Sequence, residues 1–115
     1  MHPIDGIVEF NKERRLETFK GLAEYKMLVE ELQEFLVACS ESDTHEMLNA
    51  LCDLIVLSTG AIYKLGYDPT KVLDETVKEI RSRQGSFDET TGKWQKDKNQ
   101  DASTLYVPNY ENARR

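Results

Sequence analysis

Three acidic side chains in the middle of the chain have types and spacings that suit metal chemistry. Glu31 and Glu34 lie three residues apart in the stretch EELQE, and Asp53 interrupts the apolar stretch NALCDLIVLSTGAIY (49–63). A charge on a buried helix costs roughly several kcal/mol unless it is paired, hydrogen-bonded or bound to a metal. The span from Met27 to Tyr63 contains no lysine or arginine, so a basic neighbour in the sequence does not supply the missing charge.

Helical spacing places a second group of polar side chains around Asp53. Glu46, Asn49 and Asp53 follow one another at intervals of three and four, which puts them on one helix face. If this helix packs antiparallel to the one that carries Glu31 and Glu34, the two polar faces meet. About four oxygen ligands on facing helices form a natural Mg²⁺ or Mn²⁺ site.

Other interpretations of these residues remain open at this point. Glutamates are common on exposed helices, and Asp53 could cap a helix that begins at Leu54 or bond to a neighbouring serine or tyrosine. Zinc is disfavoured, because the chain has only His2 and His45 and neither belongs to an HExxH motif. The sequence also lacks a nucleophile elbow and a glycine-rich phosphate loop.

Length and composition limit the class of protein. The 115 residues suffice for one domain, and 39% hydrophobic with 31% charged residues is an ordinary balance for a soluble protein. A net charge of −6 argues against nonspecific binding to nucleic acid or to anionic membranes. We expect no signal peptide and no membrane span, and we expect Cys39 and Cys52 to be reduced core thiols of a cytoplasmic protein.

Apolar periodicity predicts an all-α fold, an antiparallel bundle of about four helices. A weak amphipathic segment near the N-terminus precedes three helices, at about 22–39, at about 44–65 with Gly66 as its stop, and from 70 to about 83. Residues 85–115 are rich in turn residues, lack periodicity and contain no run long enough for a sheet. The prediction is a single domain, 1–115, with a helical core at about 5–84 and an extended basic tail at about 85–115.

The order of these motifs resembles a known family. The EExxE pattern, the later helix with Asp53 in NALCDLIVLSTGAIYKLGYDP, and the segment EIRSRQGSFDETTGKWQKD are similar to the MazG-like all-α nucleoside triphosphate pyrophosphohydrolases. The similarity is greatest to phage-type members of the phosphoribosyl-ATP pyrophosphohydrolase-like superfamily, and it covers residues from about 22 onward. It implies hydrolysis of a (deoxy)nucleoside triphosphate between its α- and β-phosphates, with Mg²⁺ or Mn²⁺ as cofactor and a role in nucleotide-pool housecleaning.

The resemblance also implies roles for individual residues. Glu31, Glu34 and Asp53 would hold Mg²⁺, and Asn49, a neutral ligand where relatives often carry an acid, would be the fourth ligand. Glu30 or Glu34 would act as general base through water. The residues implied to contact phosphates are Arg83, Lys93 and Lys96.

Two aromatic residues and the assembly state complete the expectations. Trp94 and Tyr106 would either stack on a base or fix the tail against the helices. A modest core and a long tail suggest a homodimer or homotetramer. The rival hypotheses are a noncatalytic adaptor or regulatory subunit that offers its acidic face to a basic partner, and a redox carboxylate protein, which would ordinarily need histidine inside the bundle.

Overall fold

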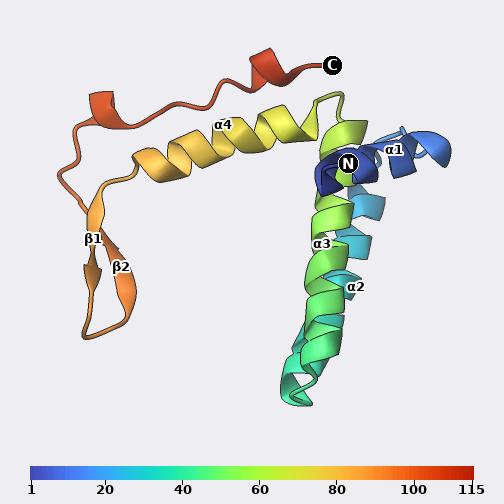
Figure 1. The fold of residues 1–115 in the computed structure, drawn as a ribbon, viewed down its shortest axis with the longest axis horizontal. Coiled ribbons are helices and arrows are strands. Elements are labelled where there is room, and N and C mark those ends of the chain that lie inside the picture. Colours follow the sequence, from blue (N-terminus) through green and yellow to red (C-terminus); the bar gives the residue numbers. More distant parts are fainter. The chain divides into compact units, whose positions relative to one another are not determined.

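The structure is a computed structural model that describes all residues, 1–115 (Figure 1). In chain order its elements are α1 (Pro3–Glu13), α2 (Gly21–Ser40), α3 (Thr44–Lys64), α4 (Pro69–Ser82), β1 (Gly85–Asp88), β2 (Lys93–Lys96) and two 3-10 helices (Ala102–Thr104 and Tyr110–Ala113). The expected all-α class with a C-terminal extension is confirmed. Residue contacts divide the chain into an N-terminal unit, residues 1–69 with Arg115, and a C-terminal unit, residues 70–114.

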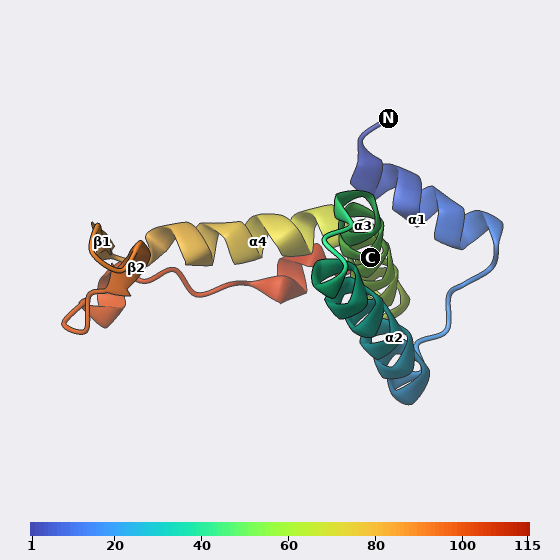
Figure 2. The ribbon, with the colours of Figure 1, turned by 90° about the horizontal axis from the view of Figure 1, so that it is seen from below.

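Helices α2 and α3 form an antiparallel hairpin, and both views show them side by side (Figures 1 and 2). A short turn joins them, in which Ser42 takes a left-handed conformation with φ 53°. The carboxylate of Asp43 then accepts a hydrogen bond from the backbone N–H of Glu46 at 3.1 Å and caps α3. This local chemistry fixes where one helix ends and the next begins.

Helix α1 packs against α3 through a close approach at Gly60. Asn11 is buried and donates its side-chain amide to the carbonyl of Ile7 at 2.9 Å. A Cβ atom at Gly60 would lie 3.1 Å from Oδ1 of Asn11, which is tighter than ordinary packing. The absence of a side chain at Gly60 therefore lets the two helices meet here.

Polar contacts close the C-terminal end of α3. Nζ of Lys64 lies 2.7 Å from Oε1 of Glu24 in an ion pair whose side chains are largely buried. The guanidinium of Arg115 stacks 3.9 Å from the ring centroid of Tyr63 and donates to the Tyr63 carbonyl at 2.6 Å. Gly66, with φ 97°, ends the helix as its sequence position predicted.

The single chain buries few apolar side chains. The buried apolar residues are Ala38, Ala50, Tyr63, Pro69 and Ala113. Large apolar residues at helical spacing stay exposed on both helices of the hairpin: Leu32, Leu36, Leu48, Leu51 and Ile55. The expectation of two core cysteines was wrong, because Cys39 and Cys52 are both exposed on helix faces that this chain does not cover.

Helix α3 is long and apolar enough to cross a membrane by length and composition alone, with a mean hydropathy of 1.3 over its best 18 residues. A helix at the centre of a soluble protein passes the same test. In this fold the helix packs along α2 and carries Asp53 near its middle.

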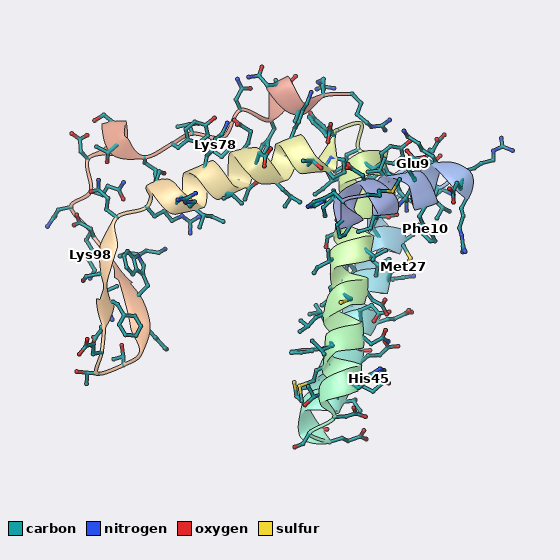
Figure 3. All side chains as sticks on the ribbon, viewed as in Figure 1. Glu9, Phe10, Met27, His45, Lys78 and Lys98 are labelled. Carbon is teal, nitrogen blue, oxygen red and sulfur yellow. The ribbon has the colours of Figure 1, made fainter.

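A buried carboxylate organises the C-terminal unit. Glu75 of α4 accepts hydrogen bonds from the hydroxyl of Tyr106 at 2.6 Å and from the backbone N–H of Asn109 at 2.8 Å. Its second oxygen lies 2.9 Å from Nζ of Lys78, which is labelled on α4 in Figure 3. Tyr106 was expected either to stack on a base or to fix the tail. In this structure it fixes the tail, because its hydroxyl donates to Glu75 of α4.

The prediction that the chain contains no strand run long enough for a sheet was wrong. β1 and β2 pair as an antiparallel hairpin with Gly85 opposite Lys96 and Asp88 opposite Lys93. Oδ1 of Asp88 accepts from the backbone N–H of Thr90 at 2.9 Å, and Gly92 takes a φ of 68°, so the turn is set by these two residues. Each strand has only four residues, too few to show a periodic pattern in the sequence.

Candidate functional site

Three carboxylates from the α2–α3 hairpin converge. One oxygen from each of Glu31, Glu34 and Asp53 lies within 4.8 Å of the others. The two glutamates share a face of α2 because they are three residues apart, and the antiparallel packing of α3 brings Asp53 opposite them. Because α3 continues without a break through Asp53, the alternative that this residue caps a new helix is wrong.

Glu31 is the member of this carboxylate cluster with the least satisfied side chain. Its Oε2 is buried and has no hydrogen-bond partner. Burial first, and then the hydrogen bond with Glu34 and the charge of Asp53, raise the pKa of Glu31 to about 7. The three carboxylates therefore form a group of possible metal ligands, and no positive charge of the chain neutralises them.

A divalent cation fits this donor set. It would neutralise three neighbouring carboxylates, and it would give the orphaned oxygen of Glu31 a partner. All three donors are hard oxygens, which Mg²⁺, Mn²⁺ and Ca²⁺ prefer, and no histidine or cysteine belongs to the group.

An acidic pocket adjoins the carboxylate cluster. Its volume is about 440 Å³, and Glu34 belongs to both. The other lining residues are Glu30, Gln33, Val37, Ala38, Glu41, Glu46 and Asn49. The structure therefore places Asn49 and Glu46 on the pocket next to the three carboxylates, and the role of Asn49 as a metal ligand stays a prediction.

The sequence analysis did not single out four pocket residues, Gln33, Val37, Ala38 and Glu41. Counted from Glu30, the pocket residues of α2 recur at intervals of three and four up to Glu41. This spacing defines one helix face and was visible in the sequence.

The residues predicted to contact phosphates lie in the C-terminal unit, and the structure brings two of the three together. Arg83 and Lys96 line a pocket of about 310 Å³ where the end of α4 meets the hairpin. Arg83 also forms an ion pair with Glu79, with Nη2 2.8 Å from Oε2. Lys93 lies three residues before Lys96 in the same strand, so it belongs to the opposite face of the hairpin.

Comparison with known proteins supplies the family. No curated protein and no solved structure matches the chain. The model of one family, described as phosphoribosyl-ATP pyrophosphohydrolase, matches residues 11–79. That range covers more than half of the chain and includes all of α2 and α3 with their three carboxylates, but ends before Arg83. The resemblance found in the sequence is thereby confirmed: the chain belongs to the phosphoribosyl-ATP pyrophosphohydrolase family, and so to pyrophosphohydrolases that act on nucleotides.

Proposed function

We propose that this protein hydrolyses a (deoxy)nucleoside triphosphate to the monophosphate and pyrophosphate, with Mg²⁺ as its cofactor and Mn²⁺ as a substitute. The observation that carries the proposal is the cluster of Glu31, Glu34 and Asp53, which lies inside the family-matched range and lacks any basic partner. Removal of excess or noncanonical nucleotides from the cellular pool is the role that this reaction would serve.

The three carboxylates would hold the ion, and the neighbouring pocket would receive the nucleotide. When bound, the ion supplies neutralisation of phosphate charge and orientation of water. The amide of Asn49 borders the same pocket and offers a neutral oxygen to the ion or to a water on it. Within the C-terminal unit, Arg83 and Lys96 would contact phosphates, the arginine with a planar fork and the lysine with a point charge.

Glu30 is the better placed of the two candidates for general base. It lines the pocket but is not one of the three carboxylates that converge, so a bound ion would leave its oxygens free. In this role a Glu30 oxygen takes the proton of the attacking water, and the bond between the α- and β-phosphates breaks with pyrophosphate as leaving group. Glu34, which belongs to both groups, serves as a ligand.

A homo-oligomer is the assembly that the exposed apolar faces support. The α2–α3 hairpin exposes Leu36 by 69% and Leu48 by 57%, while few apolar residues of the chain are buried. A second copy that packs on these faces would complete a four-helix bundle. Sedimentation analysis at micromolar concentration tests for a dimer or tetramer. A nucleotide substrate and reduced cysteines fit a cytoplasmic protein.

The decisive test of the reaction is pyrophosphate release from a panel of nucleotides. Ribo- and deoxynucleoside triphosphates and phosphoribosyl-ATP are each incubated with Mg²⁺, and monophosphate and pyrophosphate are quantified. We expect equal amounts of both from at least one triphosphate and none in the presence of a chelator. Turnover of phosphoribosyl-ATP alone would contradict the proposed substrate class, and absence of turnover with every nucleotide would favour the noncatalytic adaptor.

A further inference from the structure

The acidic pocket extends beyond the carboxylate cluster, and the proposed reaction does not use its far end. Glu30 and Glu34 lie at the end of the pocket nearest the cluster. Glu41, at the C-terminal end of α2, and Glu46, in the first turn of α3, lie at the opposite end. We call this the turn end, and His45, labelled in Figure 3, marks it. At 1.5 Å per helical residue, the turn end lies about 10 Å from the cluster along α2.

The charge of the pocket decides which part of a nucleotide it can hold. Glutamates line it at both ends, and no lysine or arginine does. An ion on the carboxylate cluster would attract phosphates to that end, while the glutamates repel them from the rest of the pocket. A nucleotide whose phosphates lie on the ion therefore directs its uncharged part, the nucleoside, toward the turn end. The volume of about 440 Å³ is in the ordinary range for a small-molecule pocket.

An apolar surface lies between the two ends of the pocket. Val37 follows Glu34 by one helical turn and precedes Glu41 by another, so the three side chains share one face of α2. Val37 is 53% exposed, and its neighbour Ala38 is small and buried, so no bulky side chain fills this part of the pocket. Enzymes that hold a single nucleobase contact its flat faces with apolar side chains and its edge with polar ones. Val37 and Glu41 are placed to do both.

The turn end offers hydrogen-bond acceptors. The side chain of Glu41 forms no hydrogen bond and no ion pair with the rest of the chain. Oε1 of Glu46 lies 3.6 Å from Nδ1 of His45, and both of these side chains are exposed. An ionised carboxylate accepts hydrogen bonds at both oxygens and donates none. The edge of a ligand that carries N–H groups therefore suits this end, and an edge of carbonyl oxygens is repelled from it.

Nucleobases differ in the edge that they present to a carboxylate. Guanine carries an N–H and an amino group side by side, which match the two oxygens of one carboxylate. Cytosine and adenine each carry an amino group next to a ring nitrogen that accepts. Thymine and uracil carry carbonyl oxygens on both sides of a single N–H, and a carboxylate repels both oxygens. An acceptor such as Glu41 therefore distinguishes bases with an amino group from bases without one.

We propose that the acidic pocket holds the nucleobase of the substrate at its turn end and selects bases that carry an amino group. Glu41 accepts the hydrogen bond from that group, and Val37 contacts the face of the ring. The proposal rests on the proposed function and adds to it the class of substrate. dGTP is the preferred substrate, dCTP and dATP follow, and dTTP and dUTP are the poorest.

Two pairs of substrates isolate the amino group. dGTP and dITP differ only in the amino group at position 2 of the base, and dCTP and dUTP differ at position 4, where an amino group replaces a carbonyl oxygen. The value of kcat/KM is measured for each with Mg²⁺ on the full chain, by release of pyrophosphate. We expect the amino-bearing member of each pair to be favoured by about five- to 150-fold, as for one well-placed contact to a base edge.

Matched variants test the role of Glu41. Glutamine has nearly the shape of glutamate but replaces one acceptor oxygen with a donor, so in Glu41→Gln the ratio of kcat/KM within each pair should fall close to one. The double variant Glu41→Gln/Glu46→Gln removes the second carboxylate of the turn end as a substitute. Glu13→Gln removes the same charge from α1, outside the pocket, and should keep the ratios of the wild type. Circular dichroism and melting temperature are recorded for each variant.

Binding of substrate analogues separates recognition from reaction. The α,β-imido analogues of dGTP and dTTP, which cannot be cleaved between the α- and β-phosphates, are titrated calorimetrically with Mg²⁺ present. Tighter binding of the guanine analogue without turnover of any triphosphate would support the base pocket and refute the reaction. Turnover with equal kcat/KM within both pairs, or wild-type ratios in the double variant, would overturn the base pocket alone. A preference for dITP or dUTP would also overturn it, and neither binding nor turnover would refute both.

Discussion

Two glutamates, one in each unit, show opposite uses of the same side chain. Glu75 of the C-terminal unit receives a tyrosine hydroxyl, a backbone N–H and a lysine ammonium, and the first of these contributes most to lowering its pKa to about 2. Glu31 of the N-terminal unit has an oxygen without any donor, and burial raises its pKa to about 7. The satisfied carboxylate joins the tail to α4 within the C-terminal unit. The unsatisfied one lacks a partner, which a bound cation would supply.

The same contrast extends to the charge of the two units. The N-terminal unit has 13 acidic and 7 basic residues, and the C-terminal unit has 8 of each. Two of the three carboxylates of α4 are paired within the unit, Glu75 with Lys78 at 2.9 Å and Glu79 with Arg83 at 2.8 Å. The excess acidity of the N-terminal unit therefore indicates where an external cation is needed.

The largest effect is expected from the carboxylate cluster. Asp53→Asn and Glu34→Gln each remove a charge that would hold the ion, and we expect turnover to fall on the order of 10³-fold in each variant. The rate of pyrophosphate release under saturating Mg²⁺ measures this, with circular dichroism as the check on helical content. Full activity in both variants would refute the assignment of the cluster.

Glu31→Gln should increase the stability of the metal-free protein. Because its pKa is raised above the unfolded value, the wild-type carboxyl destabilises the fold as the pH rises from about 4.5 to about 7. At pH 8 we expect the variant to melt about 5 °C higher than the wild type without metal, which corresponds to roughly 1 kcal/mol. Added Mg²⁺ should stabilise the wild type only. A variant that melts lower than the wild type at pH 8 would contradict the unpaired state of Glu31.

Glu75 should show the opposite dependence on pH. Its lowered pKa means that its contribution to stability is complete above about pH 4.5 and is lost as the pH falls toward 2. The NMR signal of the Asn109 amide should therefore titrate with a midpoint near 2. In Glu75→Gln this transition should vanish, and amides near Tyr106 should exchange with solvent about tenfold faster at neutral pH. A midpoint near 4.5 would mean that the tail is not held by this carboxylate.

The smallest effect distinguishes two lysines of one strand. Lys96 lines the pocket with Arg83, whereas Lys93 belongs to the opposite face of the hairpin. We expect Lys96→Gln to raise KM for the nucleotide by about two- to fivefold, as for one partly exposed charge, and Lys93→Gln to leave KM unchanged. Steady-state kinetics at low salt compares them. Equal increases in KM would show that the face of the strand does not matter.

The sequence was most informative where structure is periodic. Apolar residues at intervals of three and four predicted α2 and α3 to within one or two residues, and the acidic residues at the same intervals predicted which carboxylates would meet. The position of Gly66 as a stop followed from its preferred conformation. Exposure of Cys39 and Cys52 did not follow, because a periodic pattern does not show whether a face is covered by the same chain or by another.

The C-terminal unit was less predictable because long-range polar contacts organise it. The contact of Glu75 with Tyr106 and Asn109 joins residues more than 30 positions apart, and no local pattern in the sequence reveals it. The hairpin depends on the turn from Asp88 to Gly92 and on one aromatic pair. In the sequence these residues look like an ordinary loop, and only the pairing of Phe87 with Trp94 shows that they form a surface.

The most direct test of the account is to locate the metal ion. Crystals grown with Mn²⁺ and a non-hydrolysable deoxynucleoside triphosphate analogue are measured at the manganese absorption edge. We expect an anomalous peak between the carboxylates of Glu31, Glu34 and Asp53, with the triphosphate of the analogue against it. An analogue that is bound elsewhere, with no ion among these three side chains, would contradict the central claim.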